Sequence, residues 1–285
     1  MVTRGVSTAL DALLFLLLVS AAATTLAVPT GPTTGPDADP AATVVSRSTA
    51  SVDYRLTPRA DDETFPRRDV GFERHARGRL AALLARAATR NATVDGQPIT
   101  HTGDGLERAV ATAVANATAP RTHVVAVWRP YESAAIAGRV TAGRPPPRDA
   151  SVASRTLTVP TNAAGTREAA LAAANRSGYE GVARVVADST LAVLVPRDGM
   201  TGALAADYPT DRIAARRYHR LAALLGTDVS TAVARGNASA ANAWLRTALV
   251  DRLEPTLRDR VASPTAAARA VQSGRVRIVV RRWSA

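Results

Sequence analysis

Residues 275–283 read Arg-Val-Arg-Ile-Val-Val-Arg-Arg-Trp, and this closing stretch guides how the rest of the chain is interpreted. Apolar and basic side chains alternate along it, which is typical of a strand with one buried face. We expect three apolar residues to face a core and three arginines to face outward: Val276, Ile278 and Val280, and Arg275, Arg277 and Arg281. Because a lone strand is not stable, it must pair with an earlier strand, which ties the two ends of the folded part together.

Earlier parts of the chain supply candidate partners for this strand. Residues 51–56 and 152–159 alternate in the same way, residues 122–129 are apolar on both faces as in a central strand, and Val140 indicates a short extra strand. Helical patterns are expected over residues 66–91, after a cap at Asp104, and over 166–175, 180–194, 210–225 and 231–262. Strands and helices do not alternate regularly. The sequence therefore predicts an α+β fold, with a mixed or antiparallel sheet of about four strands packed with several helices.

The N-terminal segment predicts that most of the chain lies outside the cytoplasm. Residues 6–28 are mostly apolar, with Asp11 as their single charged residue, and are long enough for a transmembrane helix. Arg4 precedes this segment and carboxylates follow it, which places the N-terminus in the cytoplasm and the C-terminal part outside it. We therefore expect a single-pass cell-membrane protein with a leader and transmembrane helix at 1–28, a Pro/Gly/Thr linker at 29–43 and an extracytoplasmic α+β domain at 44–285.

Three interpretations of the leader stay open. It is a simple signal-anchor, a secretory signal peptide cleaved near residues 21–27, or a pilin-type leader cut between Gly5 and Val6 after the basic Arg4. Asp11 bears on the choice, because a carboxylate in an apolar segment is costly unless it lies near the interface or has a partner. In a helix assembly, Asp11 would pair with the N-terminal amine of a neighbouring subunit.

Two resemblances extend this interpretation. Residues 4–7, Arg-Gly-Val-Ser, followed by an apolar segment, resemble the N-termini of archaeal type IV pilin-like proteins. The whole chain is similar to an uncharacterised family of haloarchaeal single-span proteins encoded near pilus or secretion ATPase genes. That resemblance runs through the leader and residues 125–131, 157–160 and 276–280. It implies a pilin-like or accessory component of a type IV pilus or secretion apparatus, and it carries no known active-site residues.

The charge balance predicts an acidic partner. All 36 basic residues are arginine, and with 24 carboxylates the formal net charge is +12. Such a balance favours contact with an acidic surface glycoprotein or with anionic lipid headgroups, and Arg275, Arg277 and Arg281 are the candidate binding residues. The alternative is a scattered, solvated basic surface. Nucleic acid is not favoured, because the chain has no polybasic tract.

Four Asn-X-Ser/Thr acceptors are candidate glycosylation sites: Asn91, Asn116, Asn175 and Asn237. An excess of such acceptors is consistent with an exported, glycosylated surface. The alternative is that Ala/Thr-rich helix ends contain the motif by accident.

The sequence shows no recognisable catalytic or metal-binding motif. It has no cysteine, no nucleophile elbow, no phosphate-binding loop and no pair of histidines at zinc-motif spacing. His123 is expected in the core, and Trp128-Arg129-Pro130-Tyr131 is either an exposed recognition loop or a strand end with Trp128 buried. We therefore expect a non-catalytic membrane-anchored surface protein without cofactor, metal or small-molecule substrate. The alternatives are an arginine-rich binding module for an acidic surface partner and an exported enzyme with no recognisable motif.

Overall fold

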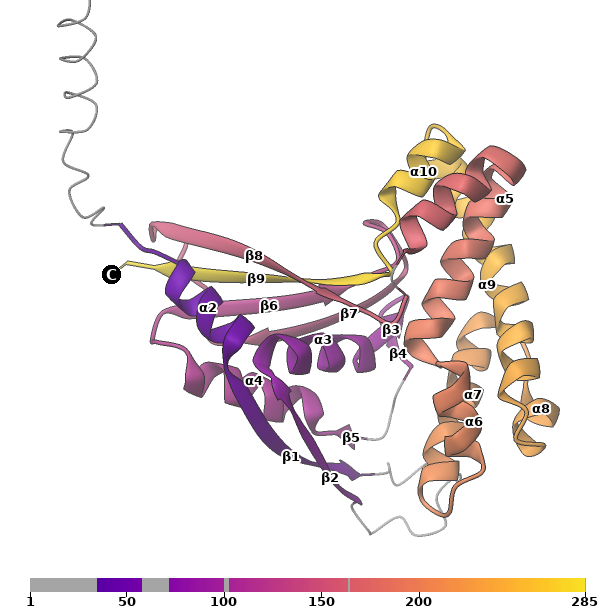
Figure 1. Ribbon diagram of the computed structural model, residues 1–285, viewed down its shortest axis with the longest axis horizontal. Helices are drawn as coiled ribbons and strands as arrows, with labels where there is room; N and C mark the ends of the chain where they lie inside the picture. The colour runs from indigo at the N-terminus through magenta and orange to yellow at the C-terminus, as the bar shows by residue number, and fades with distance from the viewer. Residues whose placement is uncertain (1–34, 58–71, 100–102, 164, 285) are drawn as a thin grey trace, which may run out of the picture. The chain divides into compact units, whose positions relative to one another are not determined.

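The computed structural model describes residues 35–57, 72–99, 103–163 and 165–284. The described residues from Asp37 onward form one compact unit, an α+β fold built on antiparallel strands (Figure 1). The processing candidates Arg4, Gly5 and Val6 lie outside the described residues, as does Asp11.

The expected architecture is corrected in two respects. Among the residues with described positions, none of the helices has both the length and the apolar character needed to cross a membrane. The sheet is also larger than the four strands expected, because the strands form one antiparallel sheet of six and another of three. The extra strands are short or polar segments, which carry little of the apolar alternation used to find strands in a sequence.

The six-stranded sheet has the order β4-β3-β7-β6-β9-β8, and every neighbouring pair is antiparallel. Its strands are β3 (Ala92–Val94), β4 (Gln97–Pro98), β6 (Thr122–Trp128), β7 (Ile136–Ala142), β8 (Val152–Pro160) and β9 (Arg275–Trp283). The closing strand β9 lies between β6 and β8, which confirms that it pairs with earlier strands. The central position of β6 confirms the inference from its apolar faces.

One face of this sheet is covered by helices and holds the core. Helices α2 (Asp39–Arg47), α3 (Leu80–Arg90) and α4 (Leu106–Ala117) contact it (Figure 1). Three residues of β6 and three of β9 form buried cross-strand pairs beneath them: Val124–Val280, Ala126–Ile278 and Trp128–Val276. The opposite face of the sheet is not covered by any helix among the described residues.

The smaller sheet corrects a predicted helix. It has the order β2-β1-β5, with β1 (Thr49–Thr57), β2 (Phe72–Arg79) and β5 (Gly103–Asp104). The helix predicted over residues 66–91 is wrong in its first half, because residues 72–79 pair with β1 and only residues 80–90 form α3. The predicted cap at Asp104 is also wrong: α4 begins after Gly105, without a side-chain cap.

The remaining helices pack on one another beside the sheets: α5 (Thr166–Leu194), α6 (Arg197–Leu204), α7 (Thr210–Leu225), α8 (Ser230–Ala234), α9 (Ala238–Arg260) and α10 (Pro264–Ala270). Ser177 and Gly178 have non-helical dihedrals, so α5 is divided where two helices were predicted. The buried stripe of α9 includes four leucines, Leu245, Leu249, Leu253 and Leu257. Trp244 does not belong to it, because 60% of this residue is exposed.

Candidate functional site

The uncovered side of the six-stranded sheet carries four arginines. Side chains alternate between the two faces of a strand, so the residues between the buried positions point to this side. We call this surface the arginine face; it consists of Arg275, Arg277, Val279 and Arg281 of β9, His123, Val125 and Val127 of β6, Arg139 and Thr141 of β7, and Ser154, Thr156 and Thr158 of β8.

The strand register sets the spacing of the charges. One row across the face contains Arg139, Val127, Arg277 and Thr158, and another contains His123, Arg281 and Ser154. Neighbouring strands lie about 4.8 Å apart, and alternate residues of one strand about 7 Å apart. The backbone therefore holds the roots of the four arginines at fixed, short separations.

No carboxylate balances these arginines on the face itself. Its twelve defining positions are arginine, histidine, hydroxyl or apolar residues. Within the described part of the chain, Arg139, Arg275, Arg277 and Arg281 form no ion pair, whereas other arginines do, for example Arg55 with Glu73 at 2.7 Å. The face is therefore a region of uncompensated positive charge.

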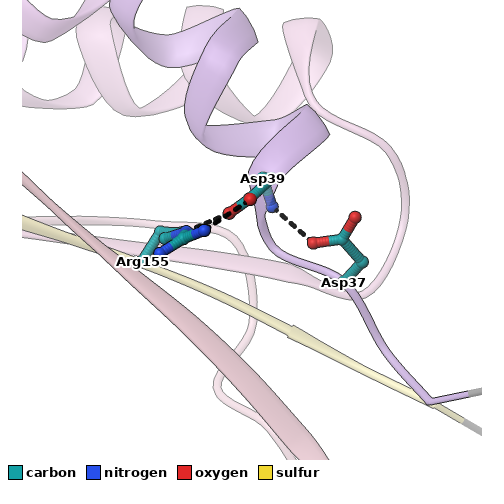
Figure 2. A network of polar contacts seen from close by, with 3 residues as sticks. All are labelled: Asp37, Asp39 and Arg155. Atoms are coloured by element: carbon teal, nitrogen blue, oxygen red, sulfur yellow. Dashed lines mark hydrogen bonds and ion pairs between the residues drawn. The ribbon is translucent and has the colours of Figure 1, made fainter. Parts of the chain in front are cut away.

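Arg155, on the other side of the same sheet, is paired with a carboxylate. It alternates with Thr156 on β8, points toward the helix-covered side and makes a two-pronged contact with Asp39 at the start of α2 (Figure 2). The hydrogen bond from Arg155 holds the pKa of Asp39 below its ordinary value. This arginine joins a helix to an edge strand and is already paired.

His123 lies on β6 directly opposite Arg281 of β9 in the strand register. Only 5% of its surface is exposed, and its Nδ1 atom has no hydrogen-bond partner among the described residues. Burial lowers the pKa of His123 below its ordinary value, and the charges of Arg281 and Arg139 lower it further. Both effects disfavour the protonated ring. His123 is buried as expected, but its Nδ1 atom has no hydrogen-bond partner among the described residues.

A cavity of about 260 Å³ opens at one end of the arginine face. Arg129, Arg275 and Arg277 line it together with Val127, Glu132, Thr158 and Gln272. Arg129 follows β6 and donates from Nη1 to the carbonyl oxygen of Glu132 at 2.6 Å. The lining of the cavity therefore includes three arginines and one glutamate.

The loop of residues 271–274, beside this cavity, is fixed from several sides. The backbone N–H of Gln272 donates to the carbonyl of Pro130 at 2.6 Å. The carbonyl of Ser273 accepts from Trp128 Nε1 at 2.9 Å and from Thr161 Oγ1 at 3.0 Å. Trp128 is therefore buried at a strand end, which excludes the exposed recognition loop as an interpretation of residues 128–131.

The structure brings the three arginines singled out in the sequence onto one face, and it adds residues that the sequence pattern did not assign to this face. Arg139 lies on β7, a strand that the sequence indicated only through Val140. Arg129, Thr158 and Gln272 join from a strand end, an edge strand and a loop. Only the pairing of strands brings these residues together, so no local pattern could have found them.

The four glycosylation candidates lie in different settings. Asn116 and Asn175 are exposed on helices. Asn237 is exposed but its side chain caps α9, and the half-buried Asn91 donates to the carbonyl of Arg139 at 3.0 Å. Asn116 and Asn175 are thus the more accessible acceptors.

A model of a family of unknown function, DUF7284, matches residues 10–283. The chain belongs to this family. The expectation of an uncharacterised family is confirmed at this level, and the DUF7284 match includes the whole arginine face. No curated protein and no solved structure matches the chain. Membership of DUF7284 brings no activity, ligand or partner with it.

Proposed function

We propose that this protein is a non-catalytic binding protein whose arginine face holds an acidic partner. The observation that carries the proposal is the set of four arginines on an uncovered sheet face whose defining positions include no carboxylate. Guanidinium groups form two parallel hydrogen bonds with carboxylate, sulfate or phosphate groups, which adds geometric specificity to the charge attraction. A surface glycoprotein that presents such groups in a row is a partner of this kind.

Screening by salt means that the arginine face must bind its partner by direct contact and not by long-range attraction. Exposed charges are screened within about 3 Å at 1 M salt and within about 10 Å at 0.1 M. A basic surface that works in a saline medium must therefore touch its partner. The pairing of β9 with a strand on each side fixes the arginine backbones, so less conformational freedom is lost on binding.

The arrangement of the face supports binding rather than catalysis. His123 is the one histidine among the defining positions of the face, and no hydroxyl of the described residues hydrogen-bonds to its Nδ1 atom. A nucleophile and its base must lie within hydrogen-bond reach of each other. The hydroxyls of Thr156, Thr158 and Ser154 instead suit a role as additional donors to an acidic group.

A second candidate, a subunit or accessory component of a type IV pilus or secretion apparatus, rests on the resemblance of residues 4–7 to pilin-like leaders. It has the same extracytoplasmic location as the first, which the exposed acceptors Asn116 and Asn175 support. In this case the acidic partner is another component of the assembly. N-terminal sequencing of the protein from its source distinguishes a mature start at Val6 from an unprocessed start at Met1.

The proposal is tested by replacing Arg275, Arg277 and Arg281 with lysine. This change keeps the positive charge and removes the planar fork of donors. We expect retention on immobilised poly-glutamate and dextran sulfate to fall about tenfold at 2 M KCl, since losing a bidentate contact costs on the order of 1.4 kcal/mol.

A matched control replaces three exposed arginines of other surfaces, Arg108, Arg176 and Arg235, with lysine. Retention of this control should equal that of the wild type. Equal retention of the wild type and of the face variant at every salt concentration would reject the proposal.

A further inference from the structure

We propose that the cavity between Arg129, Arg275 and Arg277 binds a phosphomonoester in its dianionic form. The inference rests on the proposed function, because it names the chemical group that this end of the arginine face recognises. It is carried by the charge, donors and rigidity of the cavity lining.

The charge of the lining matches a dianion. Three guanidinium groups and the single carboxylate of Glu132 leave an excess of two positive charges around about 260 Å³. A phosphomonoester carries close to two negative charges above its second pKa of about 6. A carboxylate or a sulfate ester carries one negative charge and leaves one positive charge of the lining unbalanced.

The donors of the lining remain available for a ligand. Among the described residues, the side chains of Arg275 and Arg277 make no hydrogen bond or ion pair. The guanidinium group of Arg129 donates one hydrogen bond to a described residue, to the carbonyl oxygen of Glu132. Each guanidinium has five N–H donors in a fork that fits phosphate oxygens. Thr158 adds a hydroxyl from the edge strand, opposite Arg277 in the register.

The cavity is also held in one shape. Arg277 lies on β9 between Val127 of β6 and Thr158 of β8, so strands on both sides fix its backbone. The Gln272 end is fixed by its backbone bond to Pro130 and by the two bonds that Ser273 accepts. A site whose backbone is already ordered loses less entropy when it binds a small anion.

The test is calorimetric titration of the full-length protein at pH 8 and 0.15 M KCl with methyl phosphate, and separately with methyl sulfate and acetate. Methyl phosphate should bind about tenfold more tightly than either monoanion, because it gains a further charge-assisted contact. Equal affinities for the three anions would overturn the proposal.

Variants locate the site. Arg277→Gln and Arg275→Gln should each weaken methyl phosphate binding about tenfold, whereas Arg281→Gln, which removes the same charge from the same strand outside the cavity, should change it less than about twofold. Thr158→Phe should fill the cavity and abolish binding, and a thermal unfolding midpoint equal to that of wild type would show that this variant is folded. A loss with Arg281→Gln as large as that with Arg277→Gln would also overturn the proposal.

The two proposals fail separately. If poly-glutamate is retained by the face but methyl phosphate binds no better than methyl sulfate, the cavity proposal falls and the proposed function stands. If methyl phosphate binds as described but the lysine variant retains poly-glutamate as well as wild type, the cavity is correct and the wider arginine face is not a binding surface.

Discussion

At the scale of single residues, His123 is the most unusual feature of the arginine face. A buried polar atom without a hydrogen bond costs about 1–3 kcal/mol, so Nδ1 is a local weakness of the fold. The pKa of His123 lies below its ordinary value because of burial and of the charges of Arg281 and Arg139. In the unfolded chain this shift is absent, so the unfolded state binds a proton at a higher pH than the folded state.

The protein should therefore lose stability as the pH falls below about 6.5, the ordinary pKa of histidine, and the loss should end once the pH is below the folded pKa. His123→Val, which continues the pattern of Val125 and Val127, should be at least as stable as wild type at pH 8, because it removes the unpaired Nδ1 atom, and its advantage over wild type should be larger at pH 5. Denaturant unfolding at both pH values measures this. His219→Gln, at an exposed histidine, is the control and should behave as wild type; the same acid dependence in His123→Val would contradict the assignment.

The outward arginines of β9 could be predicted because they depend only on alternation within one strand. Arg275, Arg277 and Arg281 follow from the period of two and need no knowledge of the partner strands. Arg139 and Arg129 could not be found in this way. They lie near the arginines of β9 only because β7 and β9 pair with opposite sides of β6. Pairing between strands that are distant in the sequence cannot be recognised from the residues of any one strand.

At the scale of elements, α3 and β7 approach each other unusually closely. A Cβ atom added to Gly138 of β7 would lie 1.9 Å from the carbonyl oxygen of Ala88 in α3. Glycine is therefore required here to let the helix backbone pack directly on the sheet. The contact helps to hold the helix-covered face of the sheet, and with it the position of Arg139 one residue along the strand.

Gly138→Ala should destabilise the protein by about 1–3 kcal/mol, because the added methyl group must displace backbone atoms. Gly202→Ala is the matched control, since nothing lies within 4 Å of its added Cβ on α6. It should be neutral or stabilising by up to about 1 kcal/mol. Thermal unfolding of the two variants measures the difference, and equal midpoints would show that α3 does not pack on β7 as described.

The incorrect helix over residues 66–91 shows where the prediction of elements failed. Its second half, α3, has a true helical apolar face, and that pattern was extended backward into β2. Residues 72–79 are strand because β1 lies beside them, with Asp53–His75 and Arg55–Glu73 as polar cross-strand pairs. A polar strand stabilised by its neighbour has no apolar alternation of its own, so its sequence alone could not reveal it.

At the scale of the whole molecule, the question is where the excess of positive charge lies. Several arginines among the described residues form ion pairs, for example Arg155 with Asp39 and Arg252 with Asp95. The arginine face is different, because its four arginines make no ion pair among the residues described. The net charge of +12 is therefore compensated unevenly, and the uncompensated part includes the arginine face.

The central claim is that this surface, and not the net charge of the chain, binds an acidic partner. The most direct measurement compares two variants that each lose three positive charges from the +12 total: Arg275, Arg277 and Arg281→Gln, and Arg108, Arg176 and Arg235→Gln. Their dissociation constants for poly-glutamate are measured side by side at 0.15 M and 2 M KCl. The account predicts at least about a tenfold loss for the first variant at both salt concentrations, and for the second a small loss at low salt only. Equal losses in the two variants would contradict it, because binding would then follow net charge alone.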